Sequence, residues 1–386
     1  MTNPLKGSRM MSLLSKCGVA VTLTMMMFEA TALNNVDKYQ IPPSAVSVDE
    51  SNDTRTKNEE GKAFVFDVGK LLGNGKQNKA NPLINNNVSL DNGVFGLTYG
   101  TTMSEMTALF GIPTSEYKID EEHTLYSYGR NLWVLTKHNR VIRIQNDNRW
   151  IPKRLSNYMA FDDRPTNKWV IGKNVKKGDS KKTLIERLSG SFVNDAIYRI
   201  QNKETGIYID IELALASVSK DEDWTVYNYV YGNVDDESDI TLSRFPANVF
   251  SYQDLYTIMI DNRLDDKSTN IGELKLAPIF TAATQHGNLL FVYDNHLAII
   301  SSDNEIEKVL LSNAFFDTEA KATKWRYGEL YSGQSSKLIE EMFEGKIFEL
   351  ADNYWELDFN GFKYDLFFEK STTGDMELTE IEFQAF

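Results

Sequence analysis

The sequence feature that most restricts the fold is a recurring pattern of a glycine, a short amphipathic stretch and a series of strand-like runs. The pattern is clearest at 100–111 and 333–345, with a weaker copy at 178–190. Apolar residues stand six and ten positions after the first glycine of each copy, four apart on one face of a short helix. These residues are Met106 and Phe110, Leu184 and Leu188, and Ile339 and Phe343. We therefore expect three short helices, each buried along one face.

The first of these helices has clear start and stop signals. Thr102 and Glu105 have the spacing of a capping box, in which each side chain bonds to the backbone N–H of the other residue. Gly111 can adopt the left-handed conformation that ends a helix, and the following Ile112-Pro113 prevents its continuation. The sequence thus predicts a helix that begins after Thr102 and ends before Gly111.

Runs rich in β-branched and aromatic residues follow each helix. Polar tips such as Gly129-Arg130 and Asn360-Gly361 separate neighbouring runs and favour hairpins. A further meander, 288–311, has no glycine-started helix before it. The runs are Thr124–Tyr128, Asn131–Thr136, Val141–Ile144, Ile207–Leu215, Trp224–Tyr231, Asn288–Tyr293, His296–Ser301, Ile306–Leu311, Tyr354–Phe359, Phe362–Glu369 and Leu378–Phe383.

These patterns predict an α+β fold of tandem small modules, each a short helical lead followed by its own antiparallel β-sheet. The length of 386 residues suits two or three domains at about 150 residues each. Two ordinary α+β domains with short helices are the alternative. The expected parts are a signal peptide at 1–32, a flexible polar tether at 33–92, α+β modules at 93–160 and 168–245, a β-rich meander module at 246–316 and an acidic α+β module at 325–386.

The N-terminal segment has the pattern of a signal peptide. Basic residues precede an uncharged run at 17–28, and Ala30 and Ala32 supply small residues at the spacing of a signal-peptidase site. The run is too short for the roughly 20 apolar residues of a bilayer span. We expect a periplasmic or secreted chain whose mature form begins near Leu33. A buried N-terminal helix is the alternative, which Glu29, close to the expected cleavage site, favours.

The first and last expected modules resemble a known family. The segments 100–106 and 109–113, with the strands at 126–128 and 132–134, resemble the SmpA/OmlA lipoproteins of the β-barrel assembly machine. They are also similar to the β-lactamase-inhibitory-protein fold. The resemblance implies a helical pair before a short antiparallel sheet, no catalytic centre and a role in binding other proteins. Unlike the lipoproteins, this chain has no lipobox and is several modules long.

The charge of the chain is strongly uneven. Acidic residues outnumber Lys and Arg by 55 to 41, a net charge of -14, which disfavours generic binding to a phosphate backbone. The stretch 130–187 holds 15 Lys and Arg against five acids, whereas 327–386 holds 14 acids against four Lys. The molecule is therefore expected to have a basic and an acidic end.

The acidic end predicts a charged sheet face. Alternation along 354–359 puts Trp355 and Leu357 on one face of a strand and their acidic neighbours on the other. We expect the acidic face to bind a basic protein partner. A solvated face, charged to prevent edge aggregation, is the alternative. The candidate partner-binding residues are Glu356, Asp358, Asp365, Glu380 and Glu382.

No motif in the chain predicts catalysis, a metal or a cofactor. The four histidines lack metal-ligand spacing, and there is no nucleophile elbow. The basic stretch interleaves aromatic residues, which suits an anionic polymer, the acidic end of another copy or simply core packing. These aromatic residues are Trp133, Trp150, Tyr158 and Trp169.

We therefore expect an exported, non-enzymatic protein-binding chain that acts without nucleic acid and without a membrane span. A more specific version is an inhibitor or immunity protein that masks a basic envelope enzyme or toxin. The alternatives are an envelope hydrolase that uses a carboxylate pair and a structural factor of the outer envelope. The sequence leaves the partner and the oligomeric state open.

Overall fold

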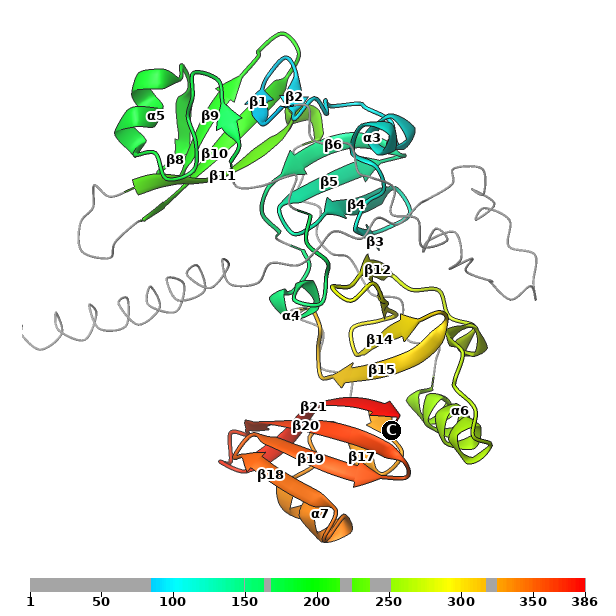
Figure 1. Ribbon diagram of the computed structural model, residues 1–386. Coiled ribbons are helices and arrows are strands. Elements are labelled where there is room, and N and C mark those ends of the chain that lie inside the picture. The colour runs from blue at the N-terminus through cyan, green and yellow to red at the C-terminus, as the bar shows by residue number, and fades with distance from the viewer. Residues whose placement is uncertain are drawn as a thin grey trace, which may run out of the picture.

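The computed structural model describes residues 85–148, 150–162, 168–215, 224–236, 251–316 and 325–385. Within them, 16 strands form one antiparallel sheet that runs the length of the molecule (Figure 1). The expected signal peptide and most of the expected tether lie outside the described residues. Across the sheet, the strands follow the order β18-β19-β20-β21-β15-β14-β13-β12-β3-β4-β5-β6-β11-β10-β9-β8.

The strands of this sheet fall into four successive meanders. The first two are β3 (Ser115–Lys118), β4 (His123–Tyr128), β5 (Leu132–Lys137) and β6 (Arg140–Gln145), then β8 (Ser191–Asn194), β9 (Ile197–Gln201), β10 (Ile207–Leu215) and β11 (Trp224–Asn233). The others are β12 (Phe280–Ala283), β13 (Leu289–Val292), β14 (Leu297–Ser302) and β15 (Glu305–Ser312), then β18 (Ile347–Ala351), β19 (Tyr354–Phe359), β20 (Phe362–Lys370) and β21 (Met376–Ala385).

Shorter elements complete the described chain. The helices are α3 (Met103–Phe110), α4 (Lys153–Ser156), α5 (Lys181–Arg187), α6 (Tyr252–Leu264) and α7 (Ser336–Met342), with 3-10 turns at Val234–Asp236 and Ile271–Leu274. Two small sheets are formed by β1 (Asn87–Ser89), β2 (Gly93–Val94) and β7 (Val170–Ile171), and by β16 (Arg326–Tyr327) and β17 (Leu330–Tyr331). No helix in the described ranges is long and apolar enough to cross a membrane.

The prediction of tandem modules with separate sheets is wrong. Strands of 100–144 and of 325–385 belong to the same continuous sheet, and the chain is mainly β. The physical reason lies in the edges of each four-stranded meander. An isolated meander leaves a row of unpaired N–H and C=O groups on both outer strands, and pairing meander to meander satisfies them.

The two halves of the sheet have the same strand order. In the N-terminal half, the last strands of the two meanders pair, β6 with β11. In the C-terminal half the last strands β15 and β21 pair in the same way. The first strands, β3 and β12, join the halves through only three paired positions, which we call the seam. As a result, β8 and β18 occupy equivalent places at the two ends of the sheet (Figure 1).

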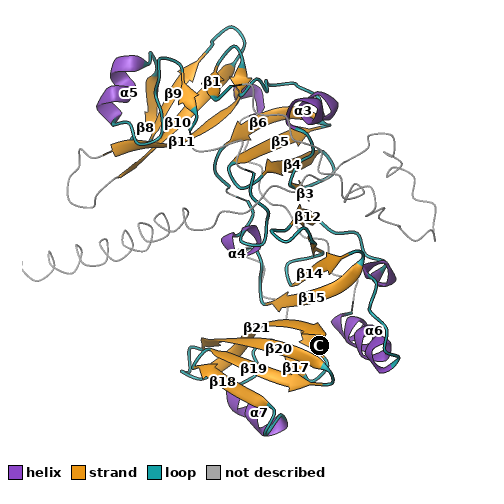
Figure 2. Ribbon diagram, in the orientation of Figure 1, coloured by secondary structure: helices purple, strands orange, loops and turns teal. Residues whose placement is uncertain are grey.

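The core divides into three clusters on the two faces of the sheet. On the helix-covered face, one cluster packs α3 and α5 against the N-terminal half and another packs α6 and α7 against the C-terminal half (Figure 2). The third cluster lies on the opposite face and spans the seam. There, Tyr117 packs against Phe280 and Phe316, and Leu155 of α4 is fully buried.

Local signals in the sequence explain the short helices. The predicted capping box of α3 is confirmed, because Thr102 and Glu105 each accept a hydrogen bond from the backbone N–H of the other. Gly111 ends the helix with a φ of 78° and a ψ of -156°, so its φ is positive but its conformation lies outside the expected left-handed helical region. Met106 and Phe110 are buried, as their spacing predicts. The sequence reading missed α6, which Ser251 caps and whose Leu255 and Met259 are buried.

Candidate protein-binding surface

The register of the last meander brings the predicted acidic residues together. Glu356 pairs with Asp365, and Asp365 pairs with Glu382, so three carboxylates stand side by side across β19, β20 and β21. Asp358 and Glu380 lie two residues along their strands, on the same face. We call these five residues the acidic face. All five candidates therefore lie on one surface, the one that faces away from α7.

The alternation that produces this face is the predicted one. Trp355 and Leu357 of β19 point into the core of the C-terminal half, where Ile339 of α7 is fully buried against the same cluster. Tyr364 and Phe383 continue this apolar row on β20 and β21, with ring centroids 5.2 Å apart. Burial of one face thus sets the register that aligns the carboxylates on the other.

Carboxylates directly opposite one another destabilise a sheet, so each needs a compensating contact. Glu356 pairs with Lys363 at 2.8 Å, and this contact raises the pKa of the lysine. Asp365 accepts a hydrogen bond of 2.9 Å from the Tyr354 hydroxyl. Partial burial and that hydrogen bond raise the pKa of Tyr354, so the hydroxyl remains a donor at neutral pH.

Two further carboxylates of the acidic face, Glu382 and Glu380, contact residues that lie far away in the sequence. Glu382 Oε1 accepts a hydrogen bond of 2.7 Å from the Tyr158 hydroxyl, and its Oε2 accepts one of 3.0 Å from Lys308 Nζ. Glu380 forms an ion pair with Arg154 of α4. Arg154 also donates a hydrogen bond of 2.8 Å to Ser312 Oγ, so α4 contacts both β15 and β21.

Burial shifts the pKa values of both Arg154 and Tyr158. Burial lowers the pKa of Arg154, an effect that the charge of Glu382 opposes. The pKa of Tyr158 is raised by burial and then by the Glu382 charge beside it. Both groups keep their neutral-pH forms, the guanidinium charged and the phenol protonated, and those are the donor forms that the two carboxylates need.

The acidic face is consequently divided into two parts. The side chains of Glu380 and Glu382 are each 13% exposed and are covered by the basic segment that carries Arg154 and Tyr158. Glu356 is 24% exposed in its side chain, Asp358 is exposed and Asp365 is half-buried. We call these last three residues the open acidic part.

The sequence reading did not foresee the partners of the acidic face. Arg154 lies in α4 and Tyr158 lies in the turn that follows it, so both side chains come from one short segment. Tyr354 stands two residues before Glu356, so strand alternation puts its hydroxyl on the acidic face. Nothing local in the sequence links 154–158 to β21.

Of the aromatic residues in the basic stretch, two are core residues. Trp133 and Trp169 are each 1% exposed, as the core reading of these residues predicted. Trp150 and Tyr158 are half-buried and pack against the cluster that spans the seam. The segment 150–159 around α4 therefore packs onto the sheet with its aromatic side chains toward the core.

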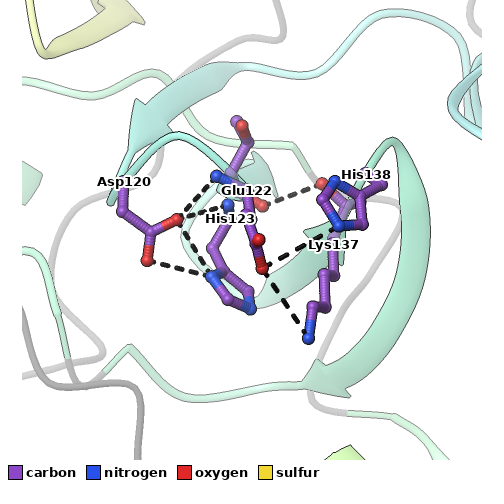
Figure 3. A network of polar contacts seen from close by, with 7 residues as sticks. Asp120, Glu122, His123, Lys137 and His138 are labelled. Carbon is purple, nitrogen blue, oxygen red and sulfur yellow. Dashed lines mark hydrogen bonds and ion pairs between the residues drawn. The ribbon is translucent and has the colours of Figure 1, made fainter.

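A second polar cluster lies at the hairpin tips of the first meander (Figure 3). Asp120 accepts from the backbone N–H of Glu122 and His123 and contacts His123 Nδ1 at 2.9 Å, while Glu122 approaches Lys137 and His138 at 3.8 Å. These contacts organise two turns. Within the described ranges, no group of three or more His, Cys, Asp or Glu side chains is placed to hold a metal ion.

Comparison with known proteins returned no match: no family model, no curated protein and no solved structure is significantly similar to this chain.

Proposed function

We propose that this chain is an exported, non-enzymatic protein that binds a basic protein partner through the open acidic part of its sheet. The observation that carries the proposal is the register that sets Glu356, Asp365 and Glu382 side by side. Such a row costs stability through repulsion. A gain in binding a cationic surface would offset that cost.

The chain itself provides an example of the ligand chemistry. Arg154 of α4 places a guanidinium on Glu380, and Tyr158, in the turn after α4, places a phenol on Glu382. A partner that presents Arg and Tyr side chains in a similar way finds comparable acceptors in Glu356, Asp358 and Asp365. Arg and Tyr are also the side chains that most often dominate binding energy at protein interfaces.

The more specific form of the proposal is an inhibitor or immunity protein that masks a basic envelope enzyme or toxin. The signal-peptide pattern of 1–32 supports export. The resemblance of the segments 100–113 and 126–134 to the SmpA/OmlA proteins supports a binding role. Charge complementarity would raise the rate of association with a cationic target.

The test compares two variants of the full mature chain with the same change in net charge. One carries Glu356→Gln, Asp358→Asn and Asp365→Asn, which keep the shape of each side chain. The control carries Glu121→Gln, Glu204→Gln and Asp261→Asn, at exposed acids on other elements. Association is measured first with a cationic lysozyme as the probe, and then with any protein captured from an envelope extract.

We expect the first variant to slow association about tenfold or more at low salt, because charges at an interface act mainly on the association rate. The control should change the rate little. The control should unfold within about 0.5 kcal/mol of the parent chain. The first variant should remain folded under the conditions of the assay, which circular dichroism checks. Equal slowing by the two variants would show that only the net charge matters, and it would refute a site at the open acidic part.

A further inference from the structure

The 16-stranded sheet ends in two open edges. Among the described residues, β8 pairs only with β9 and β18 pairs only with β19. All four residues of β8 and the last four of β18 are exposed. Each edge therefore presents unpaired backbone N–H and C=O groups to a further strand.

Exposed apolar side chains gather at these same two edges. Seven of the nine large hydrophobic side chains exposed in the described ranges lie on an end strand or on the helix beside it. Such a concentration is typical of a contact surface, since exposed apolar residues otherwise scatter singly. They are Phe192 (39%), Val193 (53%) and Ile185 (51%) at one end, and Phe348 (56%), Leu350 (57%), Leu338 (37%) and Met342 (41%) at the other.

The two edges differ in charge. Around β8, the segment 173–194 holds six Lys and Arg against two acids, and Lys181 Nζ lies 4.5 Å from the ring of Phe192 on that edge strand. Around β18, the segment 336–352 holds five acids against two Lys. Pairing of β8 with β8, or of β18 with β18, would bring like charges together. Pairing of β8 with β18 brings opposite charges together.

The direction of the strands also fits pairing of unlike edges. Every neighbouring pair in the sheet is antiparallel, and the number of strands is 16, so β8 and β18 run in opposite directions. When two copies lie head to tail with their helices on the same face, β8 of one copy therefore meets β18 of the next in the antiparallel direction. The hydrogen-bond ladder then continues without a break in its pattern.

Both end strands also carry features that limit indiscriminate pairing. The register shifts between Phe192 and Asn194 and between Glu349 and Ala351, so Val193 and Leu350 stand at irregular positions. Short, irregular edge strands offer few hydrogen bonds. A stable contact at these edges therefore needs the apolar and charge complementarity that only the unlike edge supplies.

We propose that the chain assembles head to tail with further copies of itself, by pairing β8 of one copy with β18 of the next. This contact uses the ends of the sheet and is independent of the partner proposed for the acidic face. Each added copy presents one new basic edge or one new acidic edge. Assembly of this kind extends into an open chain of copies unless rotation at each contact closes a ring.

Sedimentation velocity of the full mature chain, over a range of concentrations, tests the proposal without any other protein. We expect the sedimentation coefficient to rise with concentration at about 0.01 M salt and to rise much less at about 1 M, where the Debye length falls from about 30 to about 3 Å. A monomer at every concentration in low salt would overturn the proposal.

Charge reversal identifies which edges meet. Three charge reversals per edge change the sign of its charge. The basic edge carries Lys176→Glu, Lys181→Glu and Lys182→Glu, and the acidic edge carries Glu341→Lys, Glu344→Lys and Glu349→Lys. Each set alone should weaken assembly about tenfold or more, because like charges then face each other. A chain that carries both sets has both edges reversed and should assemble again. Loss of assembly from only one of the two sets would indicate contact between like edges and refute the head-to-tail arrangement.

An apolar substitution with a matched control completes the test. Leu350→Ser removes an exposed side chain at the acidic edge and should weaken assembly several-fold. Leu264→Ser removes a side chain that is 80% exposed at the end of α6, away from both edges, and should leave assembly unchanged. Equal effects of the two substitutions would mean that general surface hydrophobicity drives association, and would contradict the edge contact.

Discussion

The hydroxyl of Tyr158 donates a hydrogen bond of 2.7 Å to Glu382 Oε1, which joins the basic stretch of the chain to its acidic sheet. Replacing Tyr158 by Phe should lower the free energy of unfolding by about 1–3 kcal/mol, because a largely buried carboxylate loses a donor. Urea unfolding of the full chain measures the change.

A double-mutant cycle with Glu382→Gln separates this contact from the general loss of the phenol. We expect a coupling energy of about 0.5–3 kcal/mol between the two positions. Effects that add to within about 0.3–0.5 kcal/mol would show that the two side chains are energetically independent.

Truncation of Phe110 should destabilise the N-terminal half strongly. The ring is 1% exposed on α3, and its centroid lies 5.1 Å from that of the Tyr128 ring. Phe110→Ala leaves a cavity and should therefore lower the free energy of unfolding by about 3–5 kcal/mol. Phe343→Ala on the other half should cost a similar amount. The control is Leu264→Ala at an 80% exposed position away from both sheet edges, which should stay within about 0.5 kcal/mol of the parent chain.

Stability should collapse on the alkaline side. Burial raises the pKa of several tyrosines above the ordinary value of 10.0, namely Tyr117, Tyr158, Tyr229, Tyr293, Tyr327 and Tyr364. A raised folded-state pKa contributes stability that is fully present below pH 10 and is lost as the pH rises toward the folded values. Above pH 10, each of these tyrosines lowers the free energy of unfolding by up to about 1.4 kcal/mol per pH unit.

The measurement follows tyrosinate absorbance and circular dichroism together as the pH is raised. Since the buried phenols ionise when the chain unfolds, the two signals should change in one cooperative transition above pH 10. Gradual ionisation near pH 10 with the circular dichroism unchanged would contradict the burial of these side chains.

Exported material should begin near Leu33. The basic residues, the uncharged run at 17–28 and the small residues Ala30 and Ala32 together define the expected cleavage site. Intact-mass measurement of protein recovered from the envelope or the medium checks this prediction. Recovered protein that still contains Cys17 would mean that the segment is retained.

Much of the local structure was predictable because strand alternation and turn residues act over a few positions. The run Ile207–Leu215 coincides with β10, and Tyr354–Phe359 coincides with β19. The assignment of the acidic residues to one face followed from the same alternation. In contrast, α6 lacks the glycine that stands two residues before the cap of α3, α5 and α7. Its apolar positions are also shared with tyrosines such as Tyr252 and Tyr256, which obscured it.

What the sequence could not predict is the pairing of one meander with another. Every strand edge presents the same backbone groups, so β6 carries no local mark that selects β11. The match depends on burial across surfaces that are distant in the chain. The same reason hid the contact of Arg154 with Glu380, because its geometry exists only once β15 and β21 are already paired.

The seam makes the two halves mutually dependent although they repeat the same strand order. A fragment that stopped at residue 236 would leave Tyr117 without Phe280 and Phe316, and Arg154 without Glu380. A fragment that began at residue 251 would carry an uncovered row of apolar side chains on β12–β15. We therefore expect neither half to fold on its own, and we expect that exchange, duplication or deletion of one half requires a replacement for its side of the shared core.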